Sequence, residues 1–371
     1  MSATSPAIYA TRPFLPPLAE LTPYLEQIWH NRILTNSGPL HQQFEREAAD
    51  YLGVEHISMF SNGTLALATA IQAMMLSGEV ITTPYSFVAT THCLLWNNLE
   101  PVFVDVDPVS LNIDCAQIEA AITPRTTAIL GVHCYGTPCD VMAIEAIAAR
   151  HGLKVIYDAA HAFGVSYDDR SLLSFGDVSV LSLHATKVFN TFEGGAVVVP
   201  DAVSKAKIDS LKNFGKVGEI DVVALGTNGK MSEFNAALGL LQLKYVDEAI
   251  AGRRRVDRLY RERLEGVPGL KLLVQDPRAT ANHSYFPIFV TEQFPISRDA
   301  LDLRLREQGI FGRPYFYPLI SDFPMYSAYP SSAPERLPIA SEAARQVFCL
   351  PIYPDLSDEE IERIADFVAQ C

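Results

Sequence analysis

Basic residues are scarce in this sequence. Its 371 residues include 29 lysines and arginines against 43 aspartates and glutamates, which gives a formal net charge of −14 at pH 7. Proteins that bind nucleic acid or an anionic membrane surface neutralise phosphate with stripes of basic side chains. The charge balance therefore argues against both functions. The one basic cluster, Arg253 to Arg255, falls in a helical stretch and is expected to form a solvated face.

Long apolar runs and cysteine pairs are also missing. No run approaches the ~20 residues of a membrane-spanning helix, and no basic-then-apolar segment opens the chain. Cys134 and Cys139 could form half of a metal site, but no second Cys/His pair of zinc spacing follows, and no CxxC pair occurs. These absences predict a cytoplasmic protein without a metal centre.

Hydrophobic residues make up 49% of the chain, enough for sizeable cores, and they follow an alternating pattern. Between residue 53 and about residue 200, short β-branched runs are followed by Ala-rich stretches with helical spacing. This pattern predicts an α/β fold with a mostly parallel, seven-stranded sheet covered by helices on both faces. The expected strands are 56–60, 79–82, 102–106, 127–132, 154–157, 178–182 and 196–199; the expected helices between and after them are 64–76, 87–97, 115–122, 141–150 and 204–213.

The composition shifts toward Pro-rich loops beyond residue 269, which predicts a second, smaller unit. Two helical segments precede the sheet, the second at 40–52, and helices at 232–249 and 251–264 follow it. The C-terminal part should contain a strand at 285–290 and helices at 297–308 and 357–369. We expect a large domain over residues 1–250 and a small α+β domain over residues 251–371.

Three stretches bring polar side chains to the same edge of the expected sheet. The first, Ser61-Asn62-Gly63-Thr64, opens a helix, where backbone N–H groups favour a phosphate; a helix N-cap by Ser or Thr is the alternative. In the second, Asp158 ends a strand and His161 follows. An acid at that place can hold a protonated pyridine nitrogen, or it can cap the next turn.

The third stretch runs from Ser182 to Lys187 and ends another strand, with Glu193-Gly194-Gly195 shortly after it. A lysine among hydroxyl-bearing and small residues can lose its water and become nucleophilic near neutral pH, although a single loop lysine is more often on the surface. The order of phosphate turn, strand-end acid and strand-end lysine along one sheet edge favours a cofactor site.

With these stretches the chain resembles the DegT/DnrJ/EryC1/StrS sugar aminotransferases, within the fold-type I pyridoxal-phosphate enzymes. The resemblance extends over nearly the whole length and includes residues 35–39, 84–90, 226–232 and 237–243. It implies a cytoplasmic enzyme of deoxyamino sugar biosynthesis, for example for O-antigen, with pyridoxal 5'-phosphate as cofactor and a homodimer as the assembly.

The resemblance also implies the role of individual residues. Lys187 would bind the cofactor covalently and act as the proton shuttle, Asp158 would pair with its pyridine nitrogen, and His161 would donate to its phenolic oxygen. Phe87 would stack on the cofactor ring. The phosphate would be held by Gly63, Thr64 and Ser182, and by Asn228 from the neighbouring subunit.

Two positions depart from the usual family pattern. Many members have glutamine where His161 stands, although both side chains can donate a hydrogen bond to an oxyanion. Members often carry an aromatic residue and an arginine after the asparagine, where this chain has Gly229 and Lys230. Because lysine is a point charge and not a planar fork, a bidentate contact of Lys230 with carboxylate or phosphate is in question.

The segment 312–326 resembles the substrate-side loop of enzymes that aminate C4 of dTDP-4-keto-6-deoxyglucose, with L-glutamate as the usual donor. Its candidates for substrate binding are Tyr317 and Arg313, the latter as a carboxylate clamp, while a packed domain interface would explain the same aromatics. Amination of C3 in a dTDP-3-keto-6-deoxyhexose is the main alternative. A non-catalytic binding or regulatory relative and a dinucleotide oxidoreductase are two further readings; the chain has no GxGxxG after a strand.

Overall fold

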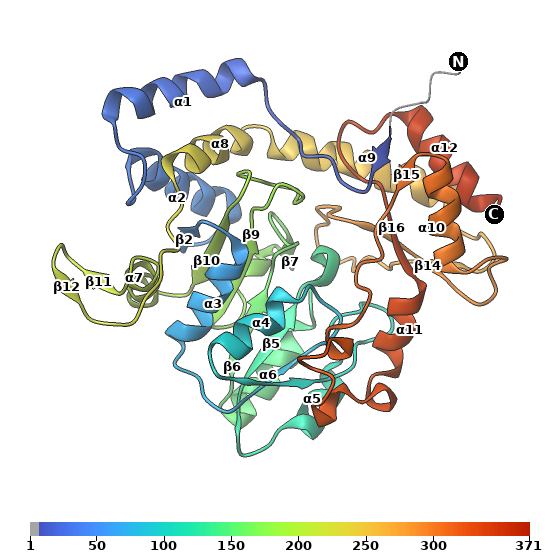
Figure 1. Cartoon of the computed structure of the whole chain (residues 1–371), viewed down its shortest axis with the longest axis horizontal. Coiled ribbons are helices and arrows are strands. Elements are labelled where there is room, and N and C mark those ends of the chain that lie inside the picture. The colour runs from blue at the N-terminus through green and yellow to red at the C-terminus, as the bar shows by residue number, and fades with distance from the viewer. Residues whose placement is uncertain (1–6) are drawn as a thin grey trace.

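The computed structural model describes residues 7–371 and has a seven-stranded sheet at its centre (Figure 1). The strand order is β2-β10-β9-β6-β5-β3-β4, and all neighbours are parallel except the two pairings of β10. The strands are β2 (His56–Phe60), β3 (Glu79–Thr82), β4 (Glu100–Phe103), β5 (Thr126–Val132), β6 (Lys154–Asp158), β9 (Val178–Ser182) and β10 (Gly195–Val199). The predicted α/β fold with a mostly parallel sheet is confirmed.

Helices cover both faces of this sheet, because successive strand residues point to opposite sides. In β10, Val197 packs with α3 (Gly63–Ala73), α4 (Ala89–Trp96) and α7 (Ala202–Leu211). Its neighbours Ala196 and Val198 pack in the other layer, which is formed by α2 (Pro39–Leu52), α5 (Cys115–Ala121), α6 (Val141–His151) and α8 (Glu233–Leu243). Burial on both faces explains why the strands read as nearly continuous apolar runs.

A second core lies in the C-terminal part. An antiparallel sheet of β13 (Leu270–Leu272), β14 (Phe286–Val290) and β16 (Val347–Leu350) packs with α9 (Val246–Leu264), α10 (Arg298–Glu307) and α12 (Asp358–Ala369). The remaining helices are α1 (Leu18–Asn31) and α11 (Pro338–Gln346); the remaining strands are β1 (Ile8–Tyr9), β7 (Ser166–Tyr167), β8 (Arg170–Ser171), β11 (Lys216–Val217), β12 (Asp221–Val222) and β15 (Ile310–Phe311). Short 3₁₀ turns occupy Cys134–Gly136, Leu172–Ser174, Ile320–Asp322, Pro330–Ser332 and Pro334–Arg336.

The first strand packs with the C-terminal core. β1 pairs in parallel with β15, and Ile8 is buried among the side chains of α9, α10 and α12. The sequence placed this segment with the large unit, since a two-residue strand carries no periodic signal of its own. α9 links the two cores, with Val246 in the first and Val256 and Tyr260 in the second. The domain boundary at residue 250 stays a prediction.

Some element boundaries differ from the predicted ones. β4 begins and ends earlier than the expected 102–106, and the break between α8 and α9 falls at Lys244 and Tyr245 and not at residue 250. The N–H groups of Lys244 and Tyr245 donate to carbonyl oxygens three residues earlier, those of Leu241 and Gln242. These bonds tighten the last turn of α8, and the helix ends there. Neither residue is a helix breaker, so the sequence carried no signal for this break.

Arg253 corrects the expectation of a solvated basic face. Its side chain is 2% exposed, and its guanidinium donates to the carbonyl oxygens of His283, Ser284 and Ile352. Burial lowers its pKa to about 10. The residue connects α9 to the chain that enters β14.

Among the described residues, no helix is both long enough and apolar enough to cross a membrane.

Candidate active site

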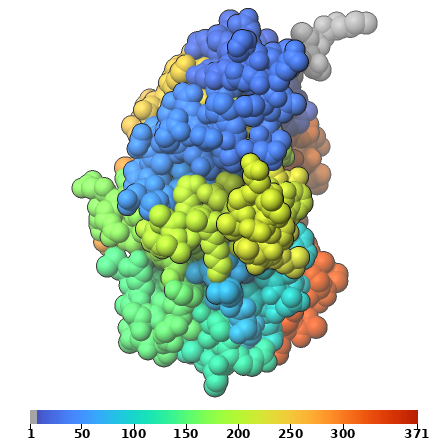
Figure 2. All heavy atoms as spheres, turned by 90° about the vertical axis from the view of Figure 1, so that its left-hand side faces the viewer, coloured from blue at the N-terminus to red at the C-terminus, as the bar shows by residue number. Residues whose placement is uncertain are grey.

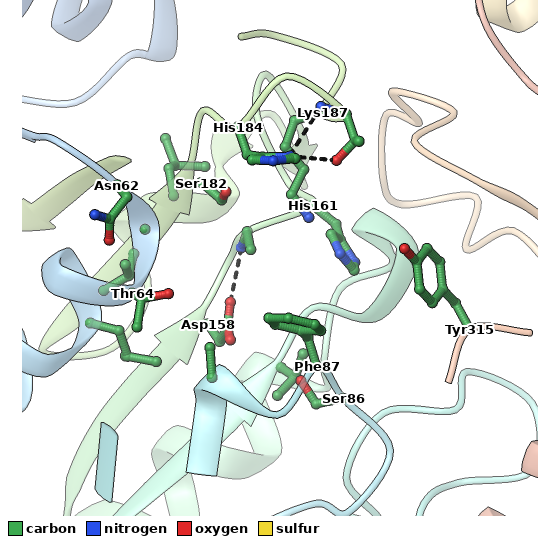
Figure 3. Close-up of a pocket in the computed structure, with 18 of the residues that line it drawn as sticks. Asn62, Thr64, Ser86, Phe87, Asp158, His161, Ser182, His184, Lys187 and Tyr315 are labelled. Atoms are coloured by element: carbon green, nitrogen blue, oxygen red, sulfur yellow. Dashed lines mark hydrogen bonds between the residues drawn. The ribbon is translucent and has the colours of Figure 1, made fainter. Parts of the chain in front are cut away.

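Most of the predicted site residues meet in one cavity of about 260 Å³ at the carboxyl ends of the parallel strands (Figure 3). β6 ends at Asp158 and β9 ends at Ser182, and α3 begins beside them. Parallel strands bring their carboxyl ends to one sheet edge, where α/β proteins bind ligands. The cavity lining includes seven of the predicted residues, Gly63, Thr64, Phe87, Asp158, His161, Ser182 and Lys187.

The N-terminus of α3 forms one end of the cavity (Figure 3). Asn62 caps this helix, with its side chain accepting from Leu65 N at 2.8 Å and its carbonyl accepting from Ala66 N at 3.1 Å. The earlier N–H groups of a helix have no partner within the helix, which leaves those of Gly63 and Thr64 beside the hydroxyls of Thr64 and Ser182. Donors of this kind at a helix N-terminus suit a phosphate.

Close packing favours glycine at position 63. A Cβ at this position would lie 3.0 Å from Ser182 Cβ and 3.3 Å from Ser182 Oγ. The turn caps the helix as the alternative expected, although the capping residue is Asn62 and not Ser or Thr. Phosphate binding by this turn stays a prediction.

Asp158 lies at the centre of the cavity and accepts two hydrogen bonds. Thr90 Oγ1 donates to its Oδ2 at 2.7 Å, and Ala160 N donates to its Oδ1 at 3.1 Å. Burial raises the pKa of this carboxyl, while the two donors and the Lys187 ammonium oppose the rise. A cationic N–H in the cavity would offset the cost of burying this charge, so the residue fits a protonated pyridine nitrogen.

A hydroxyl chain behind Asp158 was not singled out from the sequence. Ser86 Oγ and Thr90 Oγ1 are 2.7 Å apart. Since the Thr90 proton goes to Asp158, the Ser86 hydroxyl donates to Thr90. Both residues belong to the stretch 84–90 that carried the family resemblance, but only the fold shows that its hydroxyls reach the acid.

His161 is held as a neutral hydrogen-bond donor. Its Nδ1 accepts from the backbone N–H of Tyr135 at 3.1 Å, so Nδ1 carries no proton and the proton of the neutral ring is assigned to Nε2. Burial, and next the Lys187 ammonium, hold the pKa of His161 well below its ordinary value. The ring stacks on Phe316, with centroids 5.9 Å apart. His161 can therefore donate from Nε2 to an oxyanion in the cavity.

Lys187 projects from the loop after β9 into the cavity (Figure 3). Its backbone N–H donates to His184 O at 2.9 Å. Burial lowers the pKa of its amine to about 8, and the Asp158 carboxylate partly opposes this effect. A lysine with this pKa is partly unprotonated near neutral pH, which makes it a usable nucleophile and base. The surface reading of this lysine is wrong.

The aromatic side of the cavity includes Phe87, as predicted, and further residues that were not predicted. Phe87 lies at the rim with 59% of its surface exposed. In the segment 312–326 the residues that line the cavity are Tyr315 and Phe316, joined by Tyr285 from just before β14. Phe316 also packs in a core between the two units. The segment thus packs at the interface and also lines the cavity, and its contact with a substrate stays a prediction.

Tyr317 and Arg313 are not part of the cavity lining. The Tyr317 ring is 48% exposed and lies under the Arg298 guanidinium at 4.5 Å. Arg313 is exposed, and its backbone pairs with Cys349 in both directions. The substrate contacts assigned to these two residues stay predictions.

Asn228 and Lys230 also lie outside the cavity lining. Asn228 is exposed, and Lys230 Nζ donates to its Oδ1 at 2.7 Å. Burial, and then Lys216 and Lys212, lower the pKa of Lys230. The two side chains thus form a hydrogen-bonded pair. Within the described residues of a single chain, this pair does not reach the cavity lining.

Comparison with known proteins decides the family. The sequence model of the DegT/DnrJ/EryC1/StrS aminotransferase family matches residues 18–369. The chain belongs to this family. The predicted family and enzyme class, a pyridoxal-phosphate-dependent aminotransferase, are confirmed at this level.

Two relatives within the family are similar over almost their whole length. A dTDP-4-amino-4,6-dideoxy-D-glucose transaminase of Shigella dysenteriae is 53% identical over 363 residues, covering 98% of each chain. An Escherichia coli protein of the same name is 52% identical over 358 residues, covering 96% of each chain. Among solved structures, DesI in the presence of its TDP-sugar product has a TM-score of 0.95 and 39% identity, covering 100% of this chain and 94% of that one.

Proposed function

We propose that this aminotransferase moves an amino group from L-glutamate to C4 of dTDP-4-keto-6-deoxy-D-glucose, with pyridoxal 5'-phosphate as cofactor. The observation that carries the proposal is the cavity in which a buried acid, a neutral imidazole and a low-pKa lysine face one another beside a helix N-terminus. The two relatives named for the 4-amino sugar support the choice of substrate, since they match at 52–53% identity over nearly the entire chain.

The residues present fit this cofactor at each end. Bound here, pyridoxal phosphate would supply an electron-poor ring and an aldehyde that carries the amino group between substrates. The N–H groups of Gly63 and Thr64, with the hydroxyls of Thr64 and Ser182, would hold its phosphate. Asp158 would keep its ring nitrogen protonated, and His161 would donate from Nε2 to its phenolic oxygen.

Lys187 has two tasks in this proposal. Its Nζ would hold the cofactor covalently at the aldehyde carbon. As a free, neutral amine, Nζ would accept the proton from the α-carbon of the donor. A pKa of about 8 suits both tasks, because the neutral amine is available near pH 7 and its conjugate acid can return the proton.

A homodimer with shared sites would explain how Asn228, which lies outside the cavity of its own chain, can contact a cofactor phosphate. The chain from Phe214 to Leu225, in yellow-green in Figure 2, includes the β11–β12 hairpin and exposes a row of apolar side chains. They are Phe214, Val217, Ile220, Val222, Val223 and Leu225, each at least 48% exposed. Apolar clusters of this kind mark association surfaces, and a two-fold contact would carry Asn228 of the partner subunit to the phosphate end of the cavity.

The test is product analysis with a panel of sugars. The protein, pyridoxal phosphate and glutamate are incubated with dTDP-4-keto and dTDP-3-keto 6-deoxyhexoses and with UDP-keto sugars, and NMR locates the new nitrogen. We expect the 4-amino-4,6-dideoxy sugar from the dTDP-4-keto substrate. Amination at C3 would replace the proposed substrate with the main alternative.

The visible absorption of bound cofactor would distinguish this enzyme from a non-catalytic relative. The holoprotein should be yellow, with a visible band that borohydride abolishes. Lys187→Ala should destroy the glutamate half-reaction while leaving the fold and the oligomeric state intact. Unchanged turnover with glutamate in this variant would contradict the central role of the lysine.

A further inference from the structure

We propose that Tyr135 is a positioning residue that joins His161 to the segment 313–318 on the substrate side of the cavity. The connection to the sugar rests on the proposed function, whereas the connection between the two protein parts does not. Two different groups of Tyr135 make the contacts, its backbone N–H and its side-chain hydroxyl.

The backbone of Tyr135 is bent to reach His161. The residue follows β5 in the short turn Cys134–Gly136 and has a φ of 56°, in the left-handed region that a bulky residue rarely adopts. In this conformation its N–H donates to His161 Nδ1 at 3.1 Å. Such strain persists where surrounding contacts enforce it. The turn thus fixes which nitrogen of His161 faces the cofactor cavity as a donor.

The hydroxyl of Tyr135 reaches the other side of the cavity. It donates to the carbonyl oxygen of Tyr315, and Tyr85 Oη lies 2.7 Å from Tyr135 Oη. The Tyr85 hydroxyl also lies 3.5 Å from the Tyr315 carbonyl oxygen, so its one proton can go to that oxygen or to Tyr135 Oη. Burial raises the pKa of both hydroxyls well above the ordinary value, so they stay protonated donors. Two buried tyrosines thus hold one carbonyl of the substrate-side segment.

Ring contacts complete the connection. Phe316 stacks against Tyr135, with centroids 6.1 Å apart, and against His161, with centroids 5.9 Å apart. The Tyr85 ring meets Phe316 edge-on at 5.8 Å. Tyr315 and Phe316 are also the residues through which this segment lines the cavity. Displacement of the Tyr315 carbonyl would therefore move the substrate-side wall and leave Asp158 and Lys187 in place.

Removal of the hydroxyl alone tests the inference. Tyr135→Phe keeps the ring and the backbone N–H, and Tyr85→Phe removes the second hydroxyl. The matched control is Tyr157→Phe, because the Tyr157 hydroxyl is equally buried but has no hydrogen-bond partner among the described residues. All three are compared with the parent holoenzyme after their thermal unfolding has been shown to be cooperative.

Hydrogen–deuterium exchange of the resting holoenzyme is the first readout and needs no sugar. The amides of Arg313, Tyr315 and Ile320 are hydrogen-bonded. We expect the peptide over 313–320 to exchange about 3- to 10-fold faster in Tyr135→Phe, less so in Tyr85→Phe, and at the parent rate in Tyr157→Phe. Unchanged exchange in Tyr135→Phe, or equal acceleration in the control, overturns the inference.

Kinetics supply the second readout. The KM for the keto sugar should rise about 3- to 10-fold in Tyr135→Phe, while the rate of the glutamate half-reaction and the visible band of the cofactor stay at parent values. A faster-exchanging segment with an unchanged sugar KM overturns the connection to the substrate. If the parent enzyme turns over none of the keto sugars, the proposed function fails, and the exchange result still decides the role of Tyr135.

Discussion

The ionisation of single side chains at the cavity should control the reaction. Asp158 must stay ionised to serve the ring nitrogen, and burial works against this state. Its two hydrogen-bond donors, Thr90 Oγ1 and Ala160 N, stabilise the ionised form. The Thr90 hydroxyl is the donor that a substitution can remove.

Thr90→Val should move the acid limb of kcat to higher pH. Loss of this donor raises the pKa of Asp158, so the carboxyl takes up its proton at a higher pH than in the parent enzyme. The measurement is kcat against pH. Thr91→Val is the matched control, because the buried Thr91 hydroxyl has no partner among the described residues. A shift of the same size in the control would contradict this account.

The pKa of Lys187 can be followed in the cofactor-free protein. Trinitrobenzenesulfonate labelling of Lys187, located by peptide mass spectrometry, should increase with pH through a midpoint of about 8. Asp158→Asn should lower this midpoint, because the carboxylate favours the charged amine and opposes the effect of burial. A midpoint that does not move, or moves upward, would show that Asp158 does not act on the amine.

Helix α3 has two roles, in the stability of the fold and in cofactor retention, that can be tested separately. Asn62→Ala removes its cap and should cost about 1 kcal/mol of stability. It should also weaken pyridoxal phosphate retention, because the frayed turn carries the N–H groups of Gly63 and Thr64. Ser297→Ala removes the cap of α10, away from the cavity. We expect this control to lose stability in urea unfolding while the cofactor affinity, measured by fluorescence titration, is unchanged.

The sheet and its catalytic edge were predictable because they depend on local pattern. Runs of buried β-branched residues mark strands that are covered on both faces. Asp158 is the last residue of one such strand, β6, and Lys187 follows the end of another, β9. Residues that reach the cavity through tertiary packing show no such local pattern in the sequence. Tyr285 and Tyr315 come from the C-terminal part, and the pairing of Tyr135 N–H with His161 depends on a turn with positive φ. β16 and α11 were likewise missed, since neither has a long periodic pattern.

For the whole molecule, the exposed apolar hairpin on the face in Figure 2 predicts association. Ile220 and Leu225 are 87% and 85% exposed. Ile220→Asp with Leu225→Asp should convert a dimer into monomers in sedimentation velocity and lower cofactor retention. Leu303→Asp, on α10, is the control at an exposed apolar residue of the other unit. Dissociation by the control alone would place the interface elsewhere.

Asn228→Ala separates the shared site from the dimer itself. It removes one side chain and leaves the apolar residues of the hairpin unchanged. We expect weaker retention of pyridoxal phosphate in dialysis with no change in sedimentation. If cofactor affinity is unaltered, the proposal that Asn228 of the partner subunit reaches the phosphate loses its support.

The pairing of β1 with β15 bears on how the chain is made. Ile8 is synthesised about 300 residues before its strand partner Ile310, a delay of roughly 15 to 60 s at ordinary translation rates. During this delay the large sheet can form, whereas β1 cannot yet pair with β15 in the C-terminal part. The β1–β15 pairing therefore forms only after the large sheet has been synthesised.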